Sequence, residues 1–168
     1  MVMSADGIVA ERAVQNSFEW SSSGDKKQFI SRIQEIGTVL MGSNTYRSIG
    51  QSPYEGVKHL VLTHHPQQFD KYQNLEFLQG SVSDICKYLQ KNNIKHLALL
   101  GGPNVNSQFF EEKCVNEVFL TIEPLILGKG MNMVEYIPEP VHLELEKMTM
   151  LENNNSSLFH YKVKYGEN

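Results

Sequence analysis

Two apolar runs in the sequence end in glycine and continue directly into helix-forming residues. Residues 38–41 are followed by Gly42, and residues 96–100 are followed by Gly101 and Gly102. Glycine lets a backbone approach a phosphate closely, and the helix N-terminus that follows supplies free N–H groups and the positive end of its dipole. Together the two junctions predict a cradle that holds both halves of a dinucleotide.

Polar residues follow the glycines of both junctions. Their hydroxyl and amide groups can donate hydrogen bonds to phosphate oxygens, as their backbone N–H groups can. Neither junction matches the Gly-x-Gly-x-x-Gly fingerprint or a Walker loop, which disfavours a standard Rossmann protein or a kinase. Ordinary tight turns and a capped helix start are the alternatives. The predicted cofactor-binding residues beside the glycines are Ser43, Asn44, Thr45, Leu100, Pro103, Asn104 and Val105, and Thr63 joins them from the end of the run 58–63.

Asp25 is the candidate acid of the sequence. It lies four residues before Phe29, so on a helix it falls within about 40° of the apolar face. A carboxylate there is costly unless it is used, which makes Asp25 a candidate proton donor or an anchor for the N–H groups of a polar heterocycle. The spacing from Ser22 to Asp25 also matches a helix cap, so the sequence leaves both interpretations open.

Two further residues belong to this candidate substrate pocket. Trp20, the only tryptophan, precedes Asp25 by five residues and is expected at the mouth of the same region, near Phe29. Thr121 is the one hydroxyl in an otherwise apolar run, and it can donate to Asp25 if its strand lies beside the helix. A rim aromatic and a β-branched core residue are the alternatives for Trp20 and Thr121.

The composition favours one soluble globular domain over residues 1–168. The chain is 40% hydrophobic with a formal net charge of −4, and the absence of a clustered excess of Lys and Arg argues against nucleic-acid binding. No apolar run approaches the roughly 20 residues that span a bilayer, and no signal peptide precedes the first strand, so we expect a cytoplasmic protein without a membrane partner. Cys86 and Cys114 lack metal-ligand spacing, and no metal is expected.

Strand-like and helical runs alternate through the first two thirds of the sequence. The helical pattern covers 24–36 and 82–91, and a third helix is expected from Pro103 through Phe110. This order predicts an α/β fold whose sheet is largely parallel and ends in antiparallel strands joined by a hairpin loop at 152–156. The predicted strands are 38–41, 58–63, 75–78, 96–100, 117–123, 141–151 and 157–165.

The combined order of motifs resembles a known family. The opening residues 3–10 resemble the first strand and turn of the reductase domain of the bifunctional riboflavin-biosynthesis deaminase-reductase, a member of the dihydrofolate reductase superfamily. The spacing from Trp20 through Asp25 to Phe29, followed by residues 41–46, is similar to that of dihydrofolate reductase itself. Residues 100–102 and 108–109, and then 116–130, continue the resemblance, which covers nearly the whole chain.

This resemblance implies a three-layer α/β/α fold around a mixed, mainly parallel sheet of about eight strands. It also implies an NADPH-dependent reductase in which Ala5 joins the predicted cofactor-binding residues, Asp25 sits in the substrate pocket and Thr121 is its partner. The substrate is then a pyrimidine, pterin or related heterocycle. A homodimer is expected from the resemblance and from the apolar C-terminal strands.

Two departures from the family pattern keep alternatives open. Ser43 stands where dihydrofolate reductases usually carry an arginine for the extra phosphate of NADPH, so NADH is the alternative cofactor. Residues 46–50 replace the Asp-Asp-Pro segment of the riboflavin-pathway reductases. The alternatives to a pyrimidine reductase are therefore dihydrofolate reductase proper and a non-catalytic module that binds or senses a nucleotide.

Overall fold

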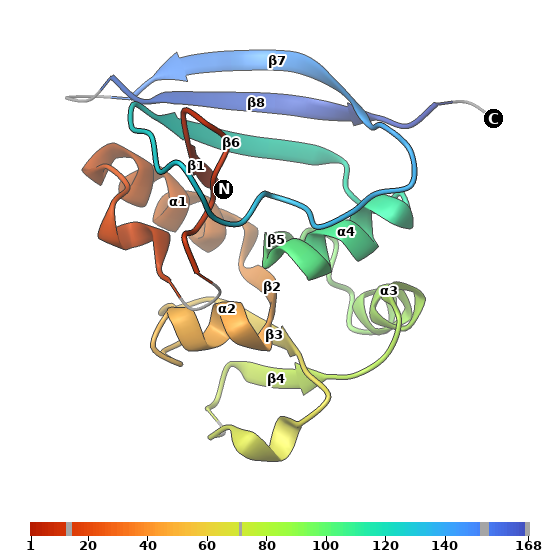
Figure 1. Ribbon diagram of the computed structural model, residues 1–168. Helices are drawn as coiled ribbons and strands as arrows, with labels where there is room; N and C mark the ends of the chain where they lie inside the picture. The colour runs from red at the N-terminus through yellow and green to blue at the C-terminus, as the bar shows by residue number, and fades with distance from the viewer. Residues whose placement is uncertain (13–14, 71, 152–154, 167–168) are drawn as a thin grey trace.

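A computed structural model describes residues 1–12, 15–70, 72–151 and 155–166 of the chain (Figure 1). Within these ranges the elements follow the predicted order, and the strand and helix boundaries lie within a few residues of those read from the sequence. The elements are β1 (Val2–Ser4), η1 (Ser17–Glu19), α1 (Ser23–Ile36), β2 (Thr38–Gly42), α2 (Ser43–Ser48), β3 (Lys58–Leu62), η2 (Pro66–Gln68), β4 (Leu75–Leu78), α3 (Val82–Lys91), β5 (Ala98–Gly101), α4 (Pro103–Glu111), β6 (Glu117–Glu123), β7 (His142–Met150) and β8 (Ser157–Lys164).

The strands of the described residues form two four-stranded sheets. One has the order β4-β3-β2-β5 and is parallel throughout, and the other has the order β1-β6-β8-β7. In the second sheet β1 runs parallel to β6, whereas β8 pairs antiparallel with both of its neighbours. The predicted α/β/α class and mainly parallel pairing are confirmed. The single sheet of about eight strands is divided in two, and a cavity lined by residues of both sheets lies between them.

The sheet β4-β3-β2-β5 is the middle of three layers. Side chains alternate across its faces, so that Val39 and Met41 pack with Ile33 of α1, while Leu40 packs with Ile85 of α3. All of these side chains are at most 2% exposed. Helices α1 and α2 therefore cover one face and α3 and α4 cover the other, which fixes the carboxyl ends of β2 and β5 side by side.

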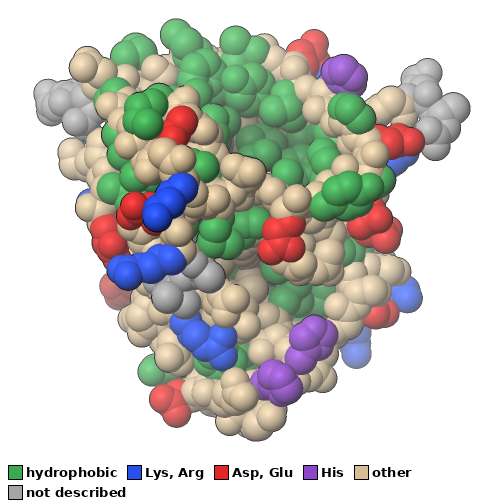
Figure 2. All heavy atoms as spheres, viewed as in Figure 1, with side chains coloured by type: hydrophobic (Ala, Val, Ile, Leu, Met, Phe, Trp, Pro, Cys, Tyr) green, Lys and Arg blue, Asp and Glu red, His purple; other side chains and the backbone are tan. Residues whose placement is uncertain are grey.

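The sheet β1-β6-β8-β7 is covered less completely. Strand β7 is its edge, and a bulge shifts the pairing of β7 with β8 between Leu145 and Lys147. Four large apolar side chains of β7 are 40–56% exposed, and hydrophobic side chains gather along the upper part of the surface shown in Figure 2, where β7 lies. They are Leu143, Leu145, Met148 and Met150. The homodimer expected from the sequence stays a prediction.

The strands β7 and β8 form the predicted antiparallel pair. Glu152, Asn153 and Asn154 of the predicted hairpin loop lie outside the described residues. Across the ranges given above, no helix combines the length and the apolar character needed to cross a membrane.

Candidate active site

A cavity of about 1130 Å³ lies between the two sheets and collects most of the predicted site residues. Both candidate catalytic side chains, Asp25 and Thr121, line it. Ala5, Gly101 and Trp20 are not among its lining residues. The predicted cofactor and substrate residues that do line it are Gly42, Ser43, Asn44, Thr45, Thr63, Leu100, Gly102, Pro103, Asn104, Val105 and Phe29.

The two glycine junctions lie against each other. Strands β2 and β5 are neighbours, and Met41 pairs with Gly101 in their register. A Cβ added at Gly42 would lie 3.1 Å from Cγ2 of Val105 and 3.8 Å from the carbonyl oxygen of Gly101. This close approach favours glycine at position 42 and brings the first turns of α2 and α4 to the same end of the cavity.

Gly101 has a backbone conformation that favours glycine. Its φ of +91° lies in the left-handed region, and the peptide bond that joins it to Gly102 is cis. The Asn106 amide fills the space where a Cβ would stand, since Nδ2 would be 3.3 Å from that atom, and Nδ2 donates to the Met133 carbonyl at 2.7 Å. Gly101 thus sets the backbone of the turn without lining the cavity, while Gly102 lines it.

The backbone of Asp25 takes part in the cap of α1, while its side chain lines the cavity. The Asp25 N–H donates to Oγ of Ser22 at 3.1 Å, as the capping interpretation predicts. In a full capping box the carboxylate would in turn accept the Ser22 N–H. That N–H donates instead to Oε1 of Glu123 at 2.9 Å. The carboxylate of Asp25, a residue only 5% exposed, is thereby left free of the cap.

Glu123 is a buried carboxylate that the sequence interpretation missed. It is 4% exposed, and its second oxygen, Oε2, accepts from the hydroxyl of Ser156 at 2.5 Å. It therefore ties the start of α1 to the second sheet, and in this way it positions Asp25. Its spacing from Thr121 was the available signal, because residues i and i+2 of a strand share a face.

Thr121 and Phe29 line the same cavity as Asp25. Thr121 is 2% exposed, and in the described part of the chain no hydrogen bond joins its hydroxyl to Asp25. The ring of Phe29 packs edge-on against Phe18 and Tyr54, with centroids 5.5 and 5.6 Å apart. Trp20 follows η1, and its buried Nε1 has no hydrogen-bond partner among the described residues.

Cationic and protonatable side chains lie at the end of the cavity near α2. Arg47, His64 and His65 all line it. Nη1 of Arg47 donates to Oδ1 of Asn44 at 3.1 Å, and the backbone N–H of His65 donates to the Thr63 hydroxyl at 3.1 Å. These groups are next to predicted cofactor-binding residues, and the sequence interpretation had not assigned Arg47 to the site.

Ala5 follows β1, in a turn that is hydrogen-bonded to the segment after the neighbouring strand β6. Its N–H donates to the Leu125 carbonyl at 2.8 Å. The neighbouring Asp6 accepts from the Ser4 hydroxyl at 2.6 Å and from the backbone N–H of Gly128 at 2.8 Å. The Ser4 hydroxyl and then the Gly128 N–H hold the pKa of Asp6 below its ordinary value. The carboxylate is thus a structural anchor for this turn.

The architecture is that of dihydrofolate reductase-like proteins. The chain superposes on a pyrimidine reductase-like protein from Corynebacterium diphtheriae with a TM-score of 0.79, 15% identity, and 98% and 90% of the two chains covered. It superposes on dihydrofolate reductase from Enterococcus faecalis, solved in complex with NADP(H), with a TM-score of 0.73, 16% identity, and 98% and 94% covered. Both similarities show the fold.

Sequence comparison identifies the family. Residues 54–156, more than half of the chain, match the model of the RibD C-terminal domain, and the protein belongs to that family. The Bacillus subtilis protein YwjB is 21% identical over 154 residues, which cover 87% of this chain and 86% of YwjB. The resemblance inferred from the sequence is confirmed.

Proposed function

We propose that the protein is an NADPH-dependent reductase that transfers hydride to a C=N or C=O carbon of a pyrimidine, pterin or related heterocycle. One observation carries the proposal: a buried carboxylate, left free by the cap of its own helix, shares a cavity with two adjoining glycine junctions. The RibD C-terminal family and the dihydrofolate reductase among the similar structures support this reaction class.

The cavity suits a dinucleotide together with a substrate. Its volume of about 1130 Å³ exceeds the roughly 300–1,000 Å³ of ordinary small-molecule sites. Gly42 and Gly102 would admit the pyrophosphate close to the backbone. Arg47 would supply positive charge for the additional phosphate of NADPH, and ring N–H groups of His64 and His65 would donate hydrogen bonds to it. When bound, NADPH supplies the hydride, delivered from C4 of its nicotinamide ring.

The side chains of this chain orient the acceptor and supply the proton. Asp25 would accept hydrogen bonds from ring N–H groups of the heterocycle, or donate the proton that balances the transferred hydride. Phe29 would pack on the ring, while Thr121 would assist Asp25. The remaining task is to hold the two rings in contact away from water, which lowers the entropic barrier to hydride transfer.

Asp25→Asn is the direct test. NADPH oxidation is followed with 5-amino-6-(5-phosphoribosylamino)uracil, dihydrofolate and dihydropterin as acceptors. We expect Asp25→Asn to retain NADPH binding and to lose on the order of 100-fold in rate with the preferred acceptor. The matched control is Asp84→Asn, which changes the equivalent cap residue of α3, outside the cavity.

The control should keep the full rate. A wild-type protein that binds neither NADPH nor NADH would overturn the proposal. Binding of NADPH with no turnover of any acceptor would favour a nucleotide-sensing module, and tighter binding of NADH would overturn the NADPH preference alone.

A further inference from the structure

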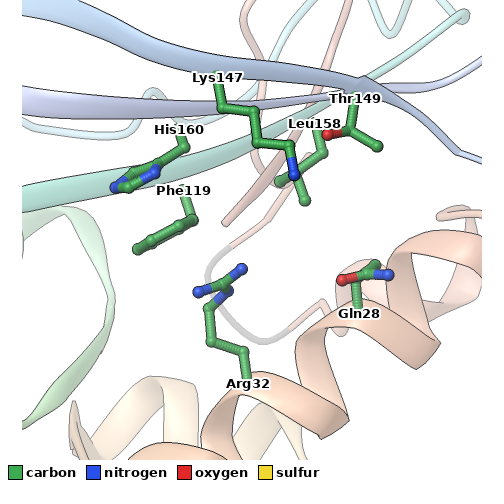
Figure 3. A pocket seen from close by; sticks show the side chains of 7 residues that line it. All are labelled: Gln28, Arg32, Phe119, Lys147, Thr149, Leu158 and His160. Carbon is green, nitrogen blue, oxygen red and sulfur yellow. The ribbon is translucent and has the colours of Figure 1, made fainter.

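A second, smaller pocket of about 190 Å³ opens beside the main cavity (Figure 3). It lies between α1 and the strands β6, β7 and β8. Four residues line both spaces, which makes the pocket an extension of the cavity that holds Asp25. These shared residues are Gln28, Arg32, Phe119 and Leu158.

Arg32 presents its guanidinium to this pocket from α1. Its Cζ lies 3.6 Å from the centroid of the Phe119 ring, and that ring lies between Arg32 and His160 (Figure 3). Stacking occupies the face of a guanidinium and leaves the N–H groups along its edge free for a planar or tetrahedral anion. Within the described ranges, Arg32 has no ion pair and no side-chain hydrogen bond.

Lys147 enters from the opposite wall. Its side chain descends from β7 toward α1 in Figure 3. The bulge in β7 sets Lys147 opposite His160, on the face of the sheet that carries Phe119 and Thr121. Among the residues that the structure describes, the Lys147 ammonium also has no carboxylate partner. Two cations from different elements therefore converge on one pocket.

The pocket is lined by no carboxylate of the described residues. His160 is already engaged, because its Nε2 lies 2.7 Å from Oε2 of Glu117, outside the pocket lining. The charge available to a ligand therefore comes from Arg32 and Lys147. Arg32 is half-buried and Lys147 is exposed. A partly desolvated guanidinium without a partner is costly, and an incoming anion would relieve that cost, while the nearby Lys147 ammonium would add a second positive charge.

We infer that this pocket binds an anionic group, a phosphate or a carboxylate, carried by the substrate whose heterocycle lies beside Asp25. The inference rests on the proposed function and specifies the substrate class. Arg32 follows Asp25 by seven residues, two helical turns on nearly the same face, or about 10 Å along α1. The substrate must therefore place its anion at the end of a spacer the length of a sugar or an aryl group.

The test compares anionic ligands with neutral counterparts by calorimetry, with and without NADPH. Uridine 5′-monophosphate is paired with uridine, and pteroate is paired with its methyl ester. The variants are Arg32→Gln, Arg32→Lys and Lys147→Gln. The control is Lys162→Gln. Lys162 is exposed and lies on the same face of β8 as His160, but it lines neither pocket.

We expect one anionic ligand to bind the wild type about tenfold or more tightly than its neutral partner, the strength of a charge-assisted hydrogen bond. Arg32→Gln and Lys147→Gln should remove this advantage, Arg32→Lys should restore part of it, and Lys162→Gln should keep it. An advantage for the monophosphate identifies a phosphate, and an advantage for pteroate identifies a carboxylate.

The inference is overturned if neither anion has an advantage, if no ligand binds, or if the advantage survives both glutamine variants. Equal melting temperatures of the variants exclude misfolding as the cause of a loss. Failure of the wild type to bind NADPH contradicts the proposed reductase, whereas the ligand pairs measured without NADPH test the anion pocket separately.

Discussion

Helices α1 and α3 begin with the same Ser-x-x-Asp pattern and use its carboxylate differently. At the start of α3, Oγ of Ser81 accepts the Asp84 N–H at 3.3 Å, and Oδ2 of Asp84 accepts the Ser81 N–H at 3.0 Å. At the start of α1 the first of these bonds forms, at 3.1 Å, but the Ser22 N–H donates to Glu123. One capping box is complete and the other is open.

The difference comes from a residue 101 positions away in the sequence. The side chain of Asp84 is 56% exposed and has no competitor for the Ser81 N–H, so it closes its own cap. Asp25 is buried beside the second sheet, where Glu123 takes its place as the acceptor. A local motif thus specifies where a helix starts, and a tertiary contact decides whether its carboxylate is available for chemistry.

Among the changes that test this difference between the two caps, replacing Glu123 should have the largest effect on stability and rate. In Glu123→Leu the Ser22 N–H and the Ser156 hydroxyl lose their acceptor, which should cost about 1–3 kcal/mol of unfolding free energy. Asp25 should then turn back to close its own cap, so the rate of NADPH oxidation should also fall. Urea unfolding and the rate of the purified variant measure the two effects.

Glu123→Gln is the control for that variant, because it keeps a carbonyl oxygen for the Ser22 N–H. It should retain most of the rate. Full activity of Glu123→Leu would show that Asp25 does not depend on Glu123 for its position.

Removing each cap hydroxyl should have a smaller effect that separates the two helices. Ser22→Ala and Ser81→Ala should each lower the unfolding free energy by about 1 kcal/mol, since each removes the acceptor of one helix N–H. Only Ser22→Ala should also change the reductase rate, because of these two helices only α1 carries a side chain into the main cavity from its first turn. Equal rates in both variants would contradict the dependence of the reductase rate on the cap of α1.

Local patterns in the sequence were sufficient to place most of the elements, and most of the candidate site residues chosen from those patterns line one cavity. Apolar runs, caps and glycines are local signals, and they placed β2, β5 and the start of α1 near their observed boundaries. The sequence predicted Asp25 as both a helix cap and a candidate acid. Its backbone N–H makes the cap hydrogen bond, and its side chain lines the cavity. Its catalytic role stays a prediction.

The anion pocket could not be predicted from local patterns. Arg32 looks like an ordinary polar residue of an amphipathic helix. Strict alternation in β7 would place Lys147 on the same face as Leu143 and Leu145, and the bulge moves it to the other face, opposite His160. A register shift of this kind depends on pairing with β8, so the residues of β7 alone do not reveal it.

The pH dependence of the α3 cap gives the smallest and most specific test. Hydrogen bonds from the Ser81 hydroxyl and then the Ser81 N–H hold the pKa of Asp84 below its ordinary value of 3.8. The unfolded chain therefore takes up this proton at a higher pH than the folded chain does. The stabilisation by the Asp84 carboxylate is fully present above the pKa of the unfolded chain, and it is lost as the pH falls through the lower pKa of the folded chain.

Asp84→Asn should be less stable than the wild type at neutral pH and equally stable in acid, as thermal unfolding across that range would show. A difference that persisted in acid would mean that Asp84 acts through its shape and not through its charge, and the closed cap of α3 would then differ from the open cap of α1 in packing alone.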